Sequence, residues 1–202
     1  MRVPLRGIYA IVDAAEGEPL AQLEAILAGG VRIVQYRAKD GVAHELVAAL
    51  RRHVHDVGGC LIVNDHAHAL ELADGLHLGQ EDLALHDFTG LRRAHPDKIL
   101  GLSCPDVLTA HAAESLGADY IGAGSIYATS SKSDAGAPIG PQGVRAIVEA
   151  VSIPVAAVGG IRHEDLAEVR ATGAAMAAVI RAISRAPDAR AAAAALVAAW
   201  GA

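Results

Sequence analysis

Acidic side chains follow two short apolar runs, and their types suit metal chemistry. Residues 61–63 lead into Asn64 and Asp65, and residues 75–78 lead into a polar stretch that contains Asp82. Carboxylate oxygens are ligands that Mg²⁺ accepts together with the oxygens of a phosphorylated substrate. Aspartate is also favoured as the cap of a helix N-terminus. These two residues taken alone are compatible with a magnesium site or with two helix caps.

Polar and basic side chains alternate after another apolar run, at Gln35, Arg37 and Lys39. In extended chain, alternate side chains share one face. The planar fork of arginine and the compact charge of lysine both suit phosphate oxygens. A solvated charged loop has the same composition, so both interpretations stay open.

The longest irregular segment, residues 124–141, carries hydroxyl groups and a cation. Lys132 stands beside Thr129, Ser130 and Ser131, a combination that suits a phosphate group. Loops of this length inside a compact domain are usually functional. A flexible polar loop is the alternative for this local pattern.

The elements that must position these residues alternate regularly along the chain. Apolar runs predict strands at residues 7–12, 31–36, 61–63, 75–78, 99–102, 119–122, 153–158 and 175–180. Amphipathic stretches predict helices at residues 20–28, 42–57, 66–73, 86–94, 105–116, 142–150, 163–171 and 188–200. In the fifth of these helices we expect Leu108, Ala112 and Leu116 to face inward.

Alternating strands and helices indicate either a closed eightfold barrel or an open doubly wound sheet. An open nucleotide-binding sheet would have a glycine fingerprint after its first strand, where this chain has residues 13–16, DAAE. The regular repeat favours the barrel. We therefore predict an α/β chain whose residues 1–202 form one single-domain (β/α)8 TIM barrel.

A barrel brings the residues after each strand to one face, where active sites of this fold lie. Gly159 and Gly160 after the seventh strand, and Ile180 and Arg181 after the eighth, occupy the usual phosphate position. A Gly-Gly pair also serves as a plain turn. His77 lies within a predicted strand and is expected to be a packed core histidine.

Composition excludes several classes of function. The net charge of −6 argues against nucleic-acid binding, which needs a basic face. Two cysteines form neither a metal pattern nor a secreted disulfide framework. No signal peptide or membrane-spanning run is expected, so a cytoplasmic location is the default expectation. A homo-oligomer is compatible with the sequence, which leaves the oligomeric state open.

Seven motifs taken in order resemble the thiamine-phosphate synthase family over nearly the whole chain. They are YAIVD, VQYRAKD, LIVND, DGLHLGQED, ILGLSC, ADYIGAGSIYATSSK and IPVAAVGGI. The resemblance implies a TIM-barrel transferase that joins hydroxymethylpyrimidine diphosphate to thiazole phosphate, or to its carboxylate. The products are thiamine phosphate and pyrophosphate, and the cofactor is Mg²⁺.

The same resemblance implies a role for each candidate residue. Asp65 and Asp82 would bind Mg²⁺, and Ser103 would contact the pyrimidine. The pyrimidine diphosphate would be held by Gln35, Tyr36, Arg37, Ala38, Lys39, Asn64 and Lys132. The thiazole phosphate would be held by Thr129, Ser130, Ser131, Gly160, Ile180 and Arg181. The residues expected to act in catalysis are Arg37, Lys39, Ser103 and Lys132.

The chain departs from the family pattern on the thiazole side. Ala128 stands where the family usually has proline, Ser131 where it has threonine, and Arg181 where it often has serine. A related group, the TenI-like proteins, performs metal-independent thiazole tautomerisation, which needs acid–base groups. That activity is expected to use a histidine shortly after Ser103, and this chain has Pro105 at that position. A non-catalytic thiazole-phosphate-binding relative is the third alternative.

Overall fold

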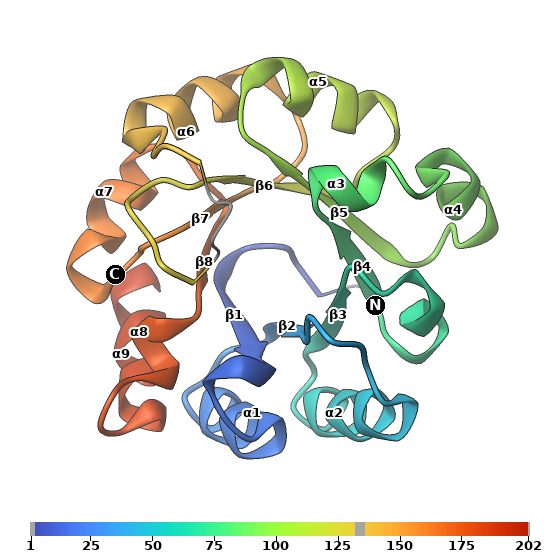
Figure 1. Cartoon of the computed structure of the whole chain (residues 1–202). Helices are drawn as coiled ribbons and strands as arrows, with labels where there is room; N and C mark the ends of the chain where they lie inside the picture. Colours follow the sequence, from blue (N-terminus) through green and yellow to red (C-terminus); the bar gives the residue numbers. More distant parts are fainter. Residues whose placement is uncertain (1–2, 132–135, 202) are drawn as a thin grey trace.

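Eight parallel strands close into a barrel in chain order, with helices around the outside (Figure 1). The computed structural model describes residues 3–131 and 136–201. The strands are β1 (Gly7–Asp13), β2 (Ile33–Arg37), β3 (Cys60–Asn64), β4 (Gly75–Leu78), β5 (Ile99–Cys104), β6 (Tyr120–Gly124), β7 (Val155–Val158) and β8 (Met176–Val179). The predicted (β/α)8 TIM-barrel fold is confirmed.

Helices cover the outer face of this sheet (Figure 1). The longer ones are α1 (Pro19–Ala28), α2 (His44–Asp56), α4 (Phe88–Ala94), α5 (Val107–Ser115), α6 (Gly140–Ala150), α7 (Leu166–Ala171) and α9 (Ala189–Gly201). Four-residue helices follow β4 and β8, namely α3 (Gln80–Leu83) and α8 (Arg181–Ser184). Short 3-10 helices are η1 (Ala14–Glu16), η2 (Ala67–Leu72) and η3 (His163–Asp165).

Side chains along each strand alternate between two buried cores. Val34 and Tyr36 belong to the core between the strands and the helices. Ile33 belongs to a smaller core inside the barrel, which Tyr9 and Tyr120 share. Because both faces of the strands are buried, the sequence shows continuous apolar runs rather than alternation.

Helix α5 begins two residues later than expected, and the face that it buries also differs from the expected one. Asp106 caps the helix by accepting a hydrogen bond from the Thr109 N–H at 2.8 Å. The buried positions are therefore Ala110 and Ala113, whereas Leu108 is 79% exposed. Ala112 is exposed as well, so the prediction that Leu108 and Ala112 face inward is wrong, whereas Leu116 is partly buried against the core.

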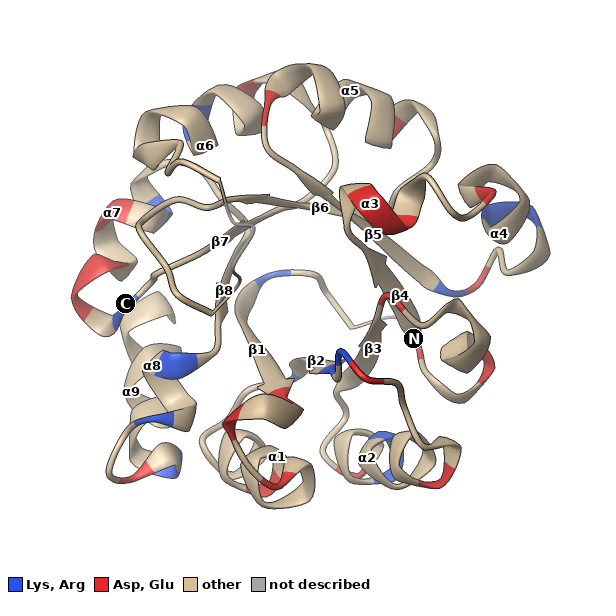
Figure 2. Ribbon diagram, viewed as in Figure 1, with Lys and Arg blue, Asp and Glu red and all other residues tan. Residues whose placement is uncertain are grey.

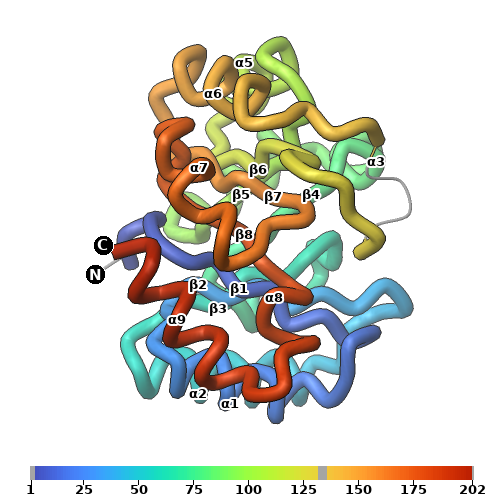
Figure 3. The backbone as a smooth tube through the Cα atoms, turned by 90° about the vertical axis from the view of Figure 1, so that its left-hand side faces the viewer, coloured from blue at the N-terminus to red at the C-terminus, as the bar shows by residue number. Residues whose placement is uncertain are grey.

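The helix expected between β3 and β4 is present as a 3-10 helix. The two short helices α3 and α8 were not expected from the sequence. In the side view, the first and last described residues lie at one end of the barrel, and α3 lies toward the opposite end (Figure 3). None of the helices in the described ranges is long and apolar enough to cross a membrane.

Candidate active site

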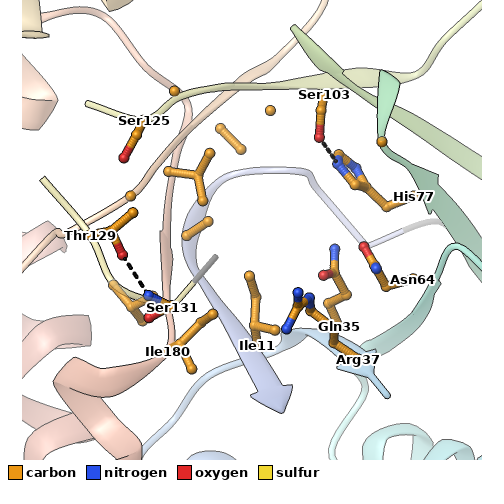
Figure 4. A pocket seen from close by; sticks show the side chains of 18 of the residues that line it. Ile11, Gln35, Arg37, Asn64, His77, Ser103, Ser125, Thr129, Ser131 and Ile180 are labelled. Carbon is orange, nitrogen blue, oxygen red and sulfur yellow. Dashed lines mark hydrogen bonds between the residues drawn. The ribbon is translucent and has the colours of Figure 1, made fainter. Parts of the chain in front are cut away.

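A cavity of about 990 Å³ lies where the strands end, and residues from every strand contribute to its wall (Figure 4). It brings together thirteen of the residues predicted from the sequence: Gln35, Arg37, Lys39, Asn64, Asp65, Asp82, Ser103, Thr129, Ser130, Ser131, Gly160, Ile180 and Arg181. Lys132, the remaining predicted cation, lies outside the residues that the structure describes.

Tyr36 and Ala38 were predicted to hold substrate, but their side chains point away from this cavity. Both are buried in the core between strands and helices, at 3% and 8% exposure. The cause is alternation along the extended chain, which turns Gln35, Arg37 and Lys39 toward the cavity and the residues between them outward. For these two side chains the structure corrects the prediction.

The carboxylates of Asp65 and Asp82 face each other across the ends of β3 and β4. Burial, followed by repulsion from Asp82, raises the pKa of Asp65 to about 6. The side chain of Asn64 donates a hydrogen bond to Asp65. Asp65 has φ 64°, in the left-handed region that few residues except glycine, asparagine and aspartate adopt. The site therefore holds two neighbouring carboxyl groups, one of them on a locally strained backbone.

Neither carboxylate serves as a helix cap, so the capping interpretation of the sequence does not hold, and the magnesium site stays a prediction. The residue before η2 is His66, which makes no capping bond from its side chain. Helix α3 begins after Gly79, so Asp82 lies within its first turn. The arrangement is that of two metal-ligand candidates, not of two caps.

The cations near this pair come from β2 and the loop after it. Arg37 donates from Nη1 to Asp13 Oδ2 at 2.6 Å, in a salt bridge whose side chains are 12% and 6% exposed. Lys39 is exposed and lines the cavity. Asp13 follows the first predicted strand in the sequence, and the structure includes it as the last residue of β1. The register that pairs Asp13 with Arg37 across β1 and β2 could be inferred only once the barrel was assumed.

Backbone groups form the opposite end of the cavity, at the loops after β6 and β7. Gly159 and Gly160 have φ of 105° and 69°, and a Cβ at Gly160 would lie 2.5 Å from the carbonyl oxygen of Ala128. Only glycine allows this close approach. In the neighbouring loop, the Ser131 N–H donates to Thr129 Oγ1 at 3.2 Å (Figure 4). This end offers hydroxyl groups and closely packed backbone.

His77 is the main cavity residue whose placement the sequence did not predict. It is 8% exposed, as expected for a core histidine, but it also lines the cavity. Its Nε2 lies 3.0 Å from Ser103 Oγ (Figure 4). Gln80 from α3 donates to the carbonyl oxygen of the same serine. The alternation along β4 was the available signal. Gly75 and His77 lie on one face of this strand, and Leu76 and Leu78 lie on the other.

Comparison with known proteins gives the same picture over the whole barrel. The family described as thiamine monophosphate synthase matches residues 8–183. The chain belongs to this family. It is 44% identical over 200 residues to thiamine-phosphate synthase from Moorella thermoacetica, covering 95% of this chain and 94% of that protein. It is 43% identical over 190 residues to the enzyme of that name from Herpetosiphon aurantiacus, covering 90% of each chain.

A solved structure agrees with these relatives. The thiamine phosphate pyrophosphorylase from Pyrococcus furiosus superposes with a TM-score of 0.89 at 33% identity, covering 98% of this chain and 96% of that one. The resemblance found in the motifs is thereby confirmed. As a member of the thiamine monophosphate synthase family, the chain is an enzyme of the transferase class.

Arg181, a departure from the family pattern, lies at the cavity mouth. Its Nε donates to Glu16 Oε1 at 2.8 Å, and its Nη1 donates to Ser130. Arg185 also binds Glu16, from Nε at 2.8 Å. The bond from Arg185, together with Arg181, lowers the pKa of Glu16 to about 2. Arg181 thus links the loops after β1, β6 and β8.

The donor set suits magnesium better than a metal held by protein ligands alone. Within the described parts of the chain, no group of three or more His, Cys, Asp or Glu side chains could enclose a metal ion. Mg²⁺ commonly uses one or two carboxylates and completes its shell with water and substrate phosphates. The facing carboxylates of Asp65 and Asp82 fit that pattern, and their mutual repulsion is what a divalent cation would relieve.

Proposed function

We propose that this chain is a thiamine-phosphate synthase that condenses hydroxymethylpyrimidine diphosphate with thiazole phosphate and releases pyrophosphate. The supporting observation is one cavity with two chemically different ends. Asp65, Asp82, Arg37 and Lys39 line one end, and the glycine loop after β7 lines the other. Two phosphorylated substrates need two such ends, placed so that their reacting atoms can meet.

The carboxylate end would receive the diphosphate. Asp65 and Asp82 would hold Mg²⁺, which when bound would neutralise charge on the diphosphate oxygens. Lys39 reaches the cavity from an exposed position, where it can contact the same oxygens. Arg37 keeps further N–H donors beside the bond to Asp13, and that bond fixes its position. Lys132 is proposed as a further cation for this end.

The opposite end would receive the thiazole phosphate. Thr129, Ser130 and Ser131 offer hydroxyl and backbone donors, and Gly160 lets the phosphate approach the main chain. Ile180 supplies an apolar wall beside Arg181 at the start of α8. Nothing on this side requires a metal.

The proposed reaction breaks one carbon–oxygen bond and forms one carbon–nitrogen bond. The methylene carbon of the pyrimidine loses the diphosphate oxygen, which leaves with the bonding electron pair. Arg37 and Lys39 stabilise the charge that develops on this leaving group. The thiazole nitrogen then supplies its lone pair to the pyrimidine cation. No protein nucleophile is needed, and the roles of Gln35, Asn64 and Ser103 are to orient the pyrimidine.

The direct test is to incubate the protein with both substrates and Mg²⁺ and to measure thiamine phosphate and pyrophosphate in equal amounts. We expect EDTA to abolish product formation and added Mg²⁺ to restore it. No product, or equal product with EDTA, would contradict the proposal. A TenI-like activity would instead appear as isomerisation of thiazole carboxylate phosphate that continues in EDTA and in an Asp82→Ala variant.

A further inference from the structure

Five polar side chains form a continuous hydrogen-bonded chain across the barrel interior, and four of them (Tyr9, Gln35, His77 and Ser103) also line the cavity. Gln35 Nε2 donates to the Tyr9 hydroxyl at 2.7 Å, and the Tyr9 and Tyr120 hydroxyls lie 2.8 Å apart. Tyr120 lies 2.9 Å from His77 Nδ1, and His77 Nε2 lies 3.0 Å from Ser103 Oγ. The chain passes through β2, β1, β6, β4 and β5 in turn.

Two glycines create the space for this polar chain. A Cβ at Gly101 of β5 would lie 2.2 Å from Tyr120 Cζ, so the tyrosine ring crosses over that strand to reach His77 on β4. A Cβ at Gly122 would lie 3.3 Å from His77 Cε1. The two tyrosines are 2% and 0% exposed, so their hydroxyl groups depend on partners within the protein.

The order of donors and acceptors follows from the amide at one end. The Gln35 NH₂ group can only donate, so the Tyr9 oxygen accepts. Among residues 3–131 and 136–201, the remaining hydrogen-bond partner of the Tyr9 hydroxyl is Tyr120, so Tyr9 donates to it. Burial raises the pKa of both tyrosines, so each keeps its proton. Tyr120 then donates to His77 Nδ1.

This order fixes the protonation of His77 and the orientation of Ser103. An imidazole whose Nδ1 accepts a hydrogen bond carries its ring proton on Nε2. Nε2–H therefore donates to Ser103 Oγ, and the serine keeps its own proton for a further partner. Ser103 lines the cavity, so that proton is available to a ligand. In the reverse order, Ser103 would donate to His77 and could only accept from the ligand.

We propose that Tyr120 and His77 are positioning residues that make Ser103 a hydrogen-bond donor toward the substrate. Given the proposed function, the group that meets Ser103 is an acceptor, such as a ring nitrogen of the pyrimidine.

The first test measures the tautomer of His77 directly and needs no substrate. In the full chain labelled with ¹⁵N-histidine, long-range ¹H–¹⁵N correlations distinguish the two neutral tautomers and the imidazolium. We expect the His77 signal to show a fixed Nε2–H tautomer, and Tyr120→Phe to remove that preference. The signal is assigned among the ten histidines by its loss in His77→Gln, or by its shift in Ser103→Ala. An Nδ1–H tautomer, an imidazolium or averaging of the tautomers in the natural chain would overturn the proposal.

The second test asks whether His77 acts through Ser103. His77→Phe keeps a ring but removes both hydrogen bonds, and we expect about a tenfold fall in kcat/KM for the pyrimidine diphosphate. In the Ser103→Ala background, the same change should cost less than about twofold, because the group it positions is gone. The KM for thiazole phosphate should not change.

Ile33→Val is the matched control, since Ile33 is 2% exposed in the same interior core but lies outside the polar chain. Ile33→Val should leave kcat/KM for the pyrimidine diphosphate nearly unchanged, both in the natural chain and in the Ser103→Ala background. Equal costs of His77→Phe in both backgrounds would show a merely structural role and overturn the proposal. If the natural chain forms no thiamine phosphate, the proposed function fails, whereas the tautomer measurement still decides the orientation of Ser103.

Discussion

Two partly buried carboxylate sites at the mouth of the barrel differ in how their charge is neutralised. Glu16, whose side chain is 10% exposed, binds Arg181 and Arg185, and its pKa is lowered to about 2. Asp65 faces Asp82 instead, and burial together with that neighbour raises its pKa to about 6. Figure 2 shows acidic α3 and the basic start of α8 on different sides of the barrel mouth.

The difference separates a carboxylate that stabilises the fold from one that serves a ligand. Glu16 gains its counter-charges from the chain itself, so its pairs hold the β1 and β8 loops together without any added ion. Asp65 has a like charge beside it and a left-handed backbone, and both features cost free energy in the folded protein. Such a cost is expected where a cation is to be bound, because binding relieves it.

The largest expected effect is on activity at the Asp65–Asp82 pair. Asp82→Asn should lower kcat/KM by about 100-fold or more, because it removes a charge that would hold Mg²⁺ beside the leaving diphosphate. Initial rates over a range of Mg²⁺ concentrations measure the effect. Asp87→Asn is the control, since Asp87 caps α4 from outside the cavity and asparagine can replace it. A loss of less than about threefold in Asp82→Asn would remove Asp82 from the metal site.

The same site should show the opposite effect on stability. Asp65→Asn removes a charge and keeps a residue that tolerates positive φ, so it should raise the free energy of unfolding in EDTA at pH 8 by about 2 kcal/mol. The folded pKa of about 6 exceeds the ordinary value of 3.8, so the penalty is absent at low pH and grows as pH rises through 6.

Urea unfolding of Asp65→Asn and of the natural chain, at pH 4 and pH 8 in EDTA, measures this gain. The two proteins should differ little at pH 4, where the Asp65 carboxyl is protonated in the folded state. Saturating Mg²⁺ should reverse the order at pH 8, since only the natural chain binds the ion with full charge. Equal stability at pH 8 in EDTA would mean that the two carboxylates do not repel each other.

Removing the charge of Glu16 should have the opposite effect on stability from removing that of Asp65, and a smaller one. Glu16→Gln should lower the free energy of unfolding at pH 7 by about 1 kcal/mol, a figure reduced for the solvent around Arg185. The folded pKa of about 2 lies below the ordinary 4.5, so this stabilisation is present above pH 4.5 and is lost as pH falls toward 2. The variant and the natural chain should therefore converge in acid. A constant difference from pH 7 to pH 3 would show that packing, not charge, is responsible.

Much of the fold could be predicted because buried parallel strands leave long apolar runs and the barrel repeats regularly. Most of the residues predicted from the positions after each strand do line the cavity, including Asp65 and Asp82. Tyr36 and Ala38 were misplaced because a family motif names a stretch of chain, whereas alternation sends only every second side chain to the cavity. The alternation of side chains along residues 35–39 could have shown that Tyr36 and Ala38 face away from the cavity.

Other features depended on contacts that no local pattern records. The pairing of Glu16 with Arg181 joins residues at opposite ends of the chain. The part of the polar chain that joins Tyr120, His77 and Ser103 requires three strands in fixed register. The short helices α3 and α8 have four residues each, too few for a periodic signal. Packing decides these features, so they became visible only in the structure.

Substitution of Arg181 has the smallest expected effect, and it tests whether the Glu16 site serves only stability or also binds substrate. Arg181→Ser restores the residue that the family often has, and it should raise the KM for thiazole phosphate by about threefold with kcat unchanged, since the guanidinium is already shared by Glu16 and Ser130. Arg185→Ser is the matched control. Arg185 binds the same Glu16 but lies outside the cavity, so its loss should destabilise the fold slightly without changing that KM. If both variants changed the KM equally, the effect would come from the neutralisation of Glu16 and the order it gives the loops. If only Arg181→Ser changed it, the arginine contributes a charge to the thiazole end, and this side of the mouth serves both stability and binding.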